Sequence, residues 1–186
     1  MRRIADRSDA RLNASYFAYG SNLNEADWHR WCADNGFRQN LLRPRFDAFL
    51  PDRALRFTRL SGIRGGGVLD VVPHRGQLVH GVVYEVMDGG WDALARKEGA
   101  PAAYQPFDTD ALTPDGLAHR VCTFEVVPAR RVPFVAPSAA YLDVVRTGCR
   151  AHSIDVGALE AAARGEPVAP GLASVFTYGT LLRGES

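Results

Sequence analysis

The sequence predicts one α+β domain, and three observations lead to that fold class. Hydrophobic residues make up 46% of the 186 residues and charged residues 23%, which is ordinary for a globular protein with a real core. This length fits one domain with some chain left over. Strand-like runs come first and two helical patterns come last, an order that favours α+β over a doubly wound parallel sheet.

The first predicted strand opens the domain and runs into a tight turn. Residues 16–18 form an apolar, aromatic run typical of a buried strand, and Gly20-Ser21-Asn22 then tolerates turn geometry. Asn24 is the expected N-cap of a helix over residues 25–34, which ends at Asn35-Gly36. These elements leave several backbone N–H groups in one small space, where an anion or a developing oxyanion can bind. An ordinary strand-to-helix connection is the alternative interpretation.

Two further stretches precede the middle of the chain. Residues 45–59 partly alternate between apolar and polar side chains, which predicts strands, or one strand broken by a turn at Pro51-Asp52. Residues 61–67 are glycine-rich and predict a loop, but no Lys-Ser/Thr pair follows to make it a phosphate-binding loop. Gly66 and Gly67 allow the backbone to approach a small substrate closely, with a flexible loop as the alternative.

Two β-branched runs and a helix follow. Residues 68–72 and 78–86 are predicted strands, joined by residues 73–77 as a hairpin turn. Residues 88–98 predict a helix, and Glu98 lies at its end, on or beside the buried face. The negative end of the helix dipole and a partly apolar pocket both disfavour an ionised carboxylate. The sequence therefore predicts a raised pKa for Glu98, as a catalytic acid or base needs.

The rest of the chain predicts two strands, two helices and a tail. In order, they are strands at 105–110 and 120–127 joined by a turn at 113–116, a helix from Ser138 through Arg150, and a helix capped by Ser153 that runs through Arg164. The predicted domain spans residues 16–166, after a flexible N-terminal arm at 1–15. Residues 167–186 begin as a Pro/Gly/Ala linker and then echo the opening strand and turn, which indicates the start of a possible second, truncated repeat.

Charge and composition exclude several classes of function. The formal net charge is +1, which gives no electrostatic basis for binding nucleic acid or an anionic membrane. No apolar run approaches the roughly 20 residues that span a bilayer. Three widely spaced cysteines fit reduced thiols, so we expect a cytoplasmic protein. The five histidines are scattered without metal-ligand spacing, so no metal site is expected.

Three stretches, in order, resemble one protein family. Residues 16–23 read Tyr-Phe-Ala-Tyr-Gly-Ser-Asn-Leu and resemble the N-terminal signature of the gamma-glutamylcyclotransferase family. The family's second signature, a Glu-Gly pair that closes a helix and is followed by a tyrosine, is similar to residues 94–99 and Tyr104. Residues 79–86 resemble the strand before that helix. The resemblance implies an α+β fold built as a mixed β-barrel with flanking helices.

The resemblance also implies an activity and a set of site residues. Members of the family release 5-oxoproline and a free amine from a small gamma-glutamyl amide, as transferases or lyases that need neither metal nor cofactor. The substrate's own α-amine attacks the γ-carbonyl, and Glu98 matches the catalytic acid/base; Glu85 is the fallback. Substrate contacts are expected from the loop and two further positions: Tyr19, Gly20, Ser21, Asn22, Leu23, Gly67 and Tyr104. Core packing is the alternative role for both tyrosines.

Two functions and several substrates remain open at this point. The alternative to an enzyme is a catalytically silent small-molecule-binding module of a tandem protein, which the loss of Glu98 would have favoured. The glutathione-specific branch usually reads Tyr-Gly-Ser-Leu, whereas this chain carries Asn22 at the last position. The Tyr-Gly-Thr-Leu of residues 178–181 resembles the gamma-glutamylamine cyclotransferase branch. Gamma-glutamyl amino acids, gamma-glutamyl amines and a gamma-glutamyl-protected metabolite are all candidate substrates.

Overall fold

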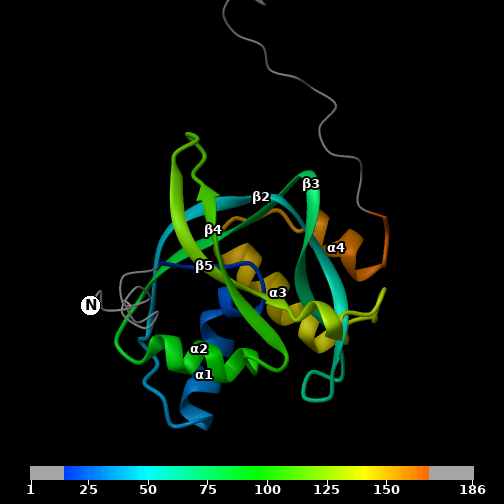
Figure 1. The fold of residues 1–186 in the computed structure, drawn as a ribbon. Coiled ribbons are helices and arrows are strands. Elements are labelled where there is room, and N and C mark those ends of the chain that lie inside the picture. The colour runs from blue at the N-terminus through cyan, green and yellow to red at the C-terminus, as the bar shows by residue number, and fades with distance from the viewer. Residues whose placement is uncertain (1–14, 168–186) are drawn as a thin grey trace, which may run out of the picture.

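Five strands close into a mixed β-barrel in the computed structural model, which describes residues 15–167 (Figure 1). The strands are β1 (Ser15–Ala18), β2 (Leu42–Ser61), β3 (Gly66–Val86), β4 (Tyr104–Leu112) and β5 (Ala118–Val126). Their order around the barrel is β1-β3-β2-β4-β5. β5 pairs with β1 in parallel and so closes the barrel, whereas all other pairs are antiparallel. The expected α+β barrel with flanking helices is confirmed.

The helices connect the strands and then complete the chain. They are η2 (Ser21–Leu23), α1 (Glu25–Asp34), α2 (Gly90–Glu98), η3 (Pro128–Arg130), α3 (Ala139–Ala151) and α4 (Gly157–Ala163). Two predicted caps are confirmed, because the side chains of Asn24 and Ser138 accept hydrogen bonds from the N–H groups of Asp27 and Tyr141. Gly99, with φ at 63°, is the left-handed residue that ends α2 directly after Glu98.

The predicted hairpin within residues 68–86 is wrong. Residues 73–77 lie inside β3, and β3 pairs with β2 on both sides of residues 74–77. Pro51 pairs with Leu78, and Arg53 pairs with Pro73. Residues 74–77 of β3 therefore bulge out of the sheet opposite a single residue of β2, Asp52. Asp52 has φ at 55°, and its side chain accepts a hydrogen bond from the N–H of Gly76 at 2.7 Å. The proline and glycine signals therefore mark an irregularity in two long strands, and β2 likewise continues through the turn expected at 51–52.

The expected start of the last helix is also wrong. Ser153 adopts a left-handed conformation with φ at 56° and lies before the helix, which begins at Gly157. The side chain of Asp155 accepts a hydrogen bond from the N–H of Gly157 at 2.9 Å instead. Asp155 thus forms a turn that leads into the helix, whose N-cap residue, Val156, makes no capping hydrogen bond with its side chain.

The expected arm at 1–15 and tail at 167–186 lie almost wholly outside the described residues. Ser15 already belongs to β1, and the description ends at residue 167. Among the helices within residues 15–167, none is both long enough and apolar enough to cross a bilayer.

Two close backbone contacts hold the loop segments against the barrel. A side chain at Gly148 of α3 would lie 2.7 Å from the backbone of Leu23 and Asn24, so only glycine lets α3 approach η2 this closely. A Cβ at Gly67 would lie 1.9 Å from the carbonyl oxygen of Val135, and the Gly67 N–H donates to the Ala136 carbonyl at 2.8 Å. The segment that follows η3 therefore packs directly on the start of β3.

We expect Gly67→Ala to lower the free energy of unfolding by about 1–3 kcal/mol, because the added methyl group meets a backbone carbonyl that cannot turn away. Gly62→Ala is the matched control, since a Cβ at Gly62 has no atom within 4 Å. Urea denaturation of the three proteins measures the difference. Equal midpoints for Gly67→Ala and Gly62→Ala would contradict the close packing of this segment.

Candidate active site

Asn22 and Glu98 meet although 76 positions separate them in the sequence. Asn22 lies in η2 after β1, and Glu98 ends α2. The Asn22 Nδ2 donates to Glu98 Oε1 at 2.8 Å and to the Tyr16 hydroxyl at 2.9 Å. Two stretches that resemble family signatures thus supply the two sides of one contact.

Loss of hydration governs the charge of Glu98. Desolvation of its carboxyl group raises the pKa above the ordinary glutamate value. The charge of Lys97, the hydrogen bond from Asn22 and the charges of Arg64 and Arg59 act in the opposite direction without cancelling this effect. The raised pKa matches the direction expected from the sequence, and it makes the Glu98 carboxylate a stronger base than an ordinary glutamate.

A small inner chamber lies beside this pair. Its volume is about 30 Å³, which is room for one water-sized group rather than for a whole amino acid. Its walls contain six of the expected site residues and four others: Tyr16, Tyr19, Gly20, Ser21, Asn22, Leu69, Glu98, Tyr104, Phe124 and Tyr141. The chamber therefore suits a single oxygen atom of a ligand.

The tyrosines of the inner chamber are fixed by their hydroxyl groups. The Tyr19 hydroxyl donates to the Phe124 carbonyl at 2.7 Å, and the Tyr104 hydroxyl donates to the Leu69 carbonyl at 2.7 Å. Burial raises the pKa of both hydroxyl groups well above the ordinary tyrosine value. Their protons are committed to backbone oxygens, so both rings serve as rigid walls.

Residues of the η2 turn line this chamber. Within a 3₁₀ turn the first N–H groups have no partner of their own. The Leu23 N–H donates to the Gly20 carbonyl at 3.0 Å and is therefore occupied. Of the loop residues expected to bind substrate, Gly20, Ser21 and Asn22 line the chamber, whereas Leu23 is a fully buried core residue outside its walls.

A larger outer basin opens from the same carboxyl group. Its volume is about 380 Å³, and it shares Ser21, Glu98, Tyr104 and Tyr141 with the inner chamber. The other expected residue, Gly67, lines neither cavity, because its missing side chain accommodates Val135. The close contact that Gly67 permits is therefore with the backbone of Val135.

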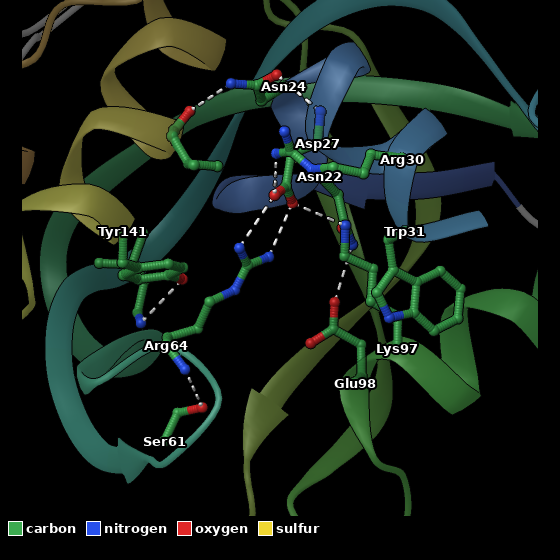
Figure 2. A network of polar contacts seen from close by, with 12 residues as sticks. Asn22, Asn24, Asp27, Arg30, Trp31, Ser61, Arg64, Lys97, Glu98 and Tyr141 are labelled. Carbon is green, nitrogen blue, oxygen red and sulfur yellow. Dashed lines mark hydrogen bonds and ion pairs between the residues drawn. The ribbon is translucent and has the colours of Figure 1, made fainter. Parts of the chain in front are cut away.

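A buried ion cluster forms one wall of the basin (Figure 2). Asp27 of α1 is 4% exposed and receives a two-pronged contact from Arg64, with Nη1–Oδ1 at 3.0 Å and Nη2–Oδ2 at 2.8 Å. Lys97, whose side chain is also 4% exposed, donates to Asp27 Oδ2 at 3.1 Å, and Arg30 Nη2 lies 3.3 Å from Oδ1. The cluster ties the β2–β3 turn and α2 to α1, beside Glu98.

Asp27 is ionised throughout the physiological pH range. Desolvation is the largest influence and would raise its pKa, but the hydrogen bond from Arg64 and the charges of Lys97 and Arg64 together lower the pKa to about 2. The same turn is held at its backbone, where the Ser138 hydroxyl donates to the Arg64 carbonyl at 2.6 Å. The glycine-rich turn is thus fixed at both its side chain and its main chain.

Sequence reasoning did not find Asp27, Arg64 or Lys97 as site residues. Asp27 lies in the first turn of the helix expected at 25–34, and Arg64 lies in the glycine-rich loop expected at 61–67. The available signal was Lys97, the only lysine of the chain, directly before Glu98. Within the described part of the chain, no three His, Cys, Asp or Glu residues gather in a way that could hold a metal ion.

Comparison with known proteins identifies one matching family. The family model described as gamma-glutamyl cyclotransferase, AIG2-like, matches residues 16–136, which include both stretches that form the site. Comparison with curated proteins gave no match.

Three solved structures share the fold. A gamma-glutamyl cyclotransferase has a TM-score of 0.67 at 19% identity, with 91% of this chain and 95% of that chain covered. A Homo sapiens protein described as uncharacterized has a TM-score of 0.65 at 20% identity, with 92% and 96% covered. YkqA from Bacillus subtilis has a TM-score of 0.68 at 23% identity, and the match covers 88% of this chain but 58% of YkqA. At these identities the likeness establishes the fold alone.

We expect Asp27→Asn to lower the free energy of unfolding by about 3 kcal/mol at pH 7, because it leaves the buried Lys97 ammonium without its counter-charge. A lowered pKa stabilises the folded state above the unfolded value of about 3.9 and loses that contribution as the pH falls toward 2. The difference between variant and parent should therefore shrink between about pH 4 and pH 2. Urea denaturation across this range, with the exposed Asp92→Asn as control, measures it; a pH-independent difference would contradict the ionic origin.

Proposed function

The chain belongs to the gamma-glutamyl cyclotransferase, AIG2-like family, and on that premise we propose that it cyclises a small gamma-glutamyl amide to 5-oxoproline and a free amine. Glu98 is the general acid/base, and the Tyr19–Leu23 loop binds the glutamyl group and the oxyanion. The observation that carries the proposal is the contact between Asn22 and Glu98, which sets a desolvated carboxyl group against the turn beside a chamber of single-oxygen size.

The proton balance assigns one group two tasks. The α-ammonium of the substrate must lose a proton before its nitrogen attacks the γ-carbonyl carbon, and the departing nitrogen must gain one as the C–N bond breaks. Glu98 accepts the first proton and returns it to the leaving amine. The attacking nitrogen loses its second proton as it becomes the lactam N–H, and the free amine takes up one proton as it becomes an ammonium, so no proton is consumed overall. The raised pKa of Glu98 suits both transfers, because a carboxyl group with an ordinary pKa would be a weaker base and would hold the proton less tightly until the leaving amine accepts it.

The γ-carbonyl oxygen becomes an oxyanion when the α-amine attacks. The chamber of about 30 Å³ beside Gly20, Ser21 and Asn22 accommodates an oxygen of this kind, and the first N–H groups of the turn are the proposed donors for it. Tyr19 and Tyr104, held through their hydroxyl groups, restrict the space so that the glutamyl chain folds for ring closure.

Asn22 acts on Glu98 as a positioning residue. Its Nδ2 bonds both Glu98 and Tyr16, so the carboxyl group is oriented from β1 rather than from its own helix. The retained pair of Asn22 and Glu98 favours the enzyme over a silent binding module on the same fold, because a module that only binds has no need of a desolvated carboxyl group.

We expect Glu98→Gln to reduce 5-oxoproline release by at least about 100-fold, because glutamine cannot exchange a proton. The variant should unfold at the same temperature as the parent or a higher one at pH 7, since a desolvated ionised carboxyl group destabilises the folded state. Release from a panel of gamma-glutamyl amino acids, amines and peptides is measured beside thermal unfolding. A folded variant with near-parental turnover would refute the role of Glu98.

The pH profile of kcat/KM should have its acid limb above about 4.3, the ordinary glutamate pKa, because Glu98 must be ionised to accept the first proton. Activity is present above the raised pKa and is lost as the pH falls through it. Asn22→Ala should move this limb further upward, since the hydrogen bond from Asn22 lowers the pKa. An acid limb below 4 in the parent would show that a different group controls activity.

A further inference from the structure

The outer basin carries an excess of positive charge. Its walls contain five cationic side chains, those of Arg30, Arg59, Arg64, Arg96 and Lys97, against the three carboxylates of Asp27, Asp34 and Glu98. The basin therefore has a net charge of +2 when all eight groups are ionised, although the whole chain is close to neutral at +1. A cavity with this balance favours an anionic ligand.

Most of the cations are already committed. Arg30, Arg64 and Lys97 share the carboxylate of Asp27. Across residues 15–167, neither Arg59 nor Arg96 forms an ion pair with a carboxylate. Arg96 is exposed on α2 and lies over the ring of Phe37, with the guanidinium 5.7 Å from the ring centroid. Arg59 is therefore the more deeply placed of the two free cations.

Arg59 lines the same basin as Glu98. Its guanidinium lies 5.9 Å from the centroid of the Tyr104 ring, which walls both cavities, and its charge contributes to lowering the pKa of Glu98. The pairing of β2 with β3 is irregular between Phe57 and Arg59, and bulges of this kind redirect side chains near active sites. A half-buried guanidinium without a counter-ion is a preformed partner for a ligand carboxylate.

The geometry points to Arg59 as the residue that reads the leaving group, and to a leaving amine that carries an anionic group. This inference rests on the proposed cyclotransferase function, since it assigns the inner chamber to the γ-carbonyl oxygen and the outer basin to the amine beyond the scissile bond. The expected substrates are gamma-glutamyl amino acids or peptides with a free carboxylate, rather than gamma-glutamyl amines. The volume of about 380 Å³ leaves room for an amino-acid residue beyond the reacting carbonyl.

A matched set of substrates tests the inference. Gamma-glutamyl-alanine, gamma-glutamyl-alaninamide and gamma-glutamyl-ethylamine share the glutamyl group; the second neutralises the alanine carboxylate, and the third lacks it. For the parent protein we expect kcat/KM to be at least about tenfold higher for gamma-glutamyl-alanine than for either neutral compound, mainly through KM. Equal values for the three compounds would overturn the inference while leaving the cyclotransferase function intact.

Variants of Arg59 identify the residue responsible. Arg59→Gln should lower kcat/KM for gamma-glutamyl-alanine about tenfold and change that for gamma-glutamyl-ethylamine less than about twofold, whereas Arg59→Lys should restore part of the loss. Arg120→Gln, an exposed arginine on β5, is the control for loss of one positive charge. An equal loss on all three substrates would show that Arg59 binds the glutamyl group, and would refute its role in reading the leaving amine.

Binding separates failure of the inference from failure of the function. If no compound yields 5-oxoproline, the cyclotransferase proposal fails, and calorimetry with the same three compounds and the parent protein still tests the basin. Binding of gamma-glutamyl-alanine that is at least about tenfold tighter than that of the alaninamide, and that Arg59→Gln abolishes, supports the anionic ligand. Equal binding of the two, or no binding of either, refutes it.

Discussion

The carboxylate of Asp27 is the interaction on which the site depends. It is almost fully buried and faces Arg64 from the β2–β3 turn, Lys97 from α2 and Arg30 from its own helix. A carboxylate and an ammonium that are both removed from water stabilise the fold only as a pair, because either one alone is a desolvated charge. Three segments that are distant in the sequence are thereby fixed beside Glu98, and the basin has a defined wall before any ligand arrives (Figure 2).

The same carboxylate controls the chemistry indirectly. Lys97 and Arg64 both lower the pKa of Glu98, and without a counter-charge they would favour a permanently ionised glutamate. Both cations are paired with Asp27, and desolvation remains the largest influence on the pKa of Glu98. A residue of a structural ion cluster, Lys97, and the proposed acid/base, Glu98, are therefore direct neighbours on one helix.

The features predictable from the sequence are those that short stretches encode. The Asn24 cap, the Gly99 stop and the raised pKa of Glu98 each follow from a few adjacent residues. The segment at 73–77 misled because Pro and Gly mark a turn and a strand irregularity with the same letters, and only the partner strand decides between them. The bond from Arg64 to Asp27 spans 37 positions, and no local pattern in one sequence reports such a pairing. Gly67 illustrates the same limit, since its sequence context indicates close approach but does not say to what.

The two cavities divide the recognition problem in a way that bears on specificity. Every gamma-glutamyl amide presents the same carbonyl and the same α-amine, so the inner chamber and Glu98 meet identical chemistry whatever the substrate. Differences between substrates lie wholly beyond the scissile bond, and only the outer basin can detect them. A shared fold at 19–23% identity therefore carries little information on the leaving group, because strand order and the turn after β1 fix the inner chamber alone. The cations of the basin come from the end of β2, the turn after it and two helices, where residues can change without disturbing the barrel. Under the proposed function, discrimination between leaving groups therefore falls to the charged side chains of the outer basin.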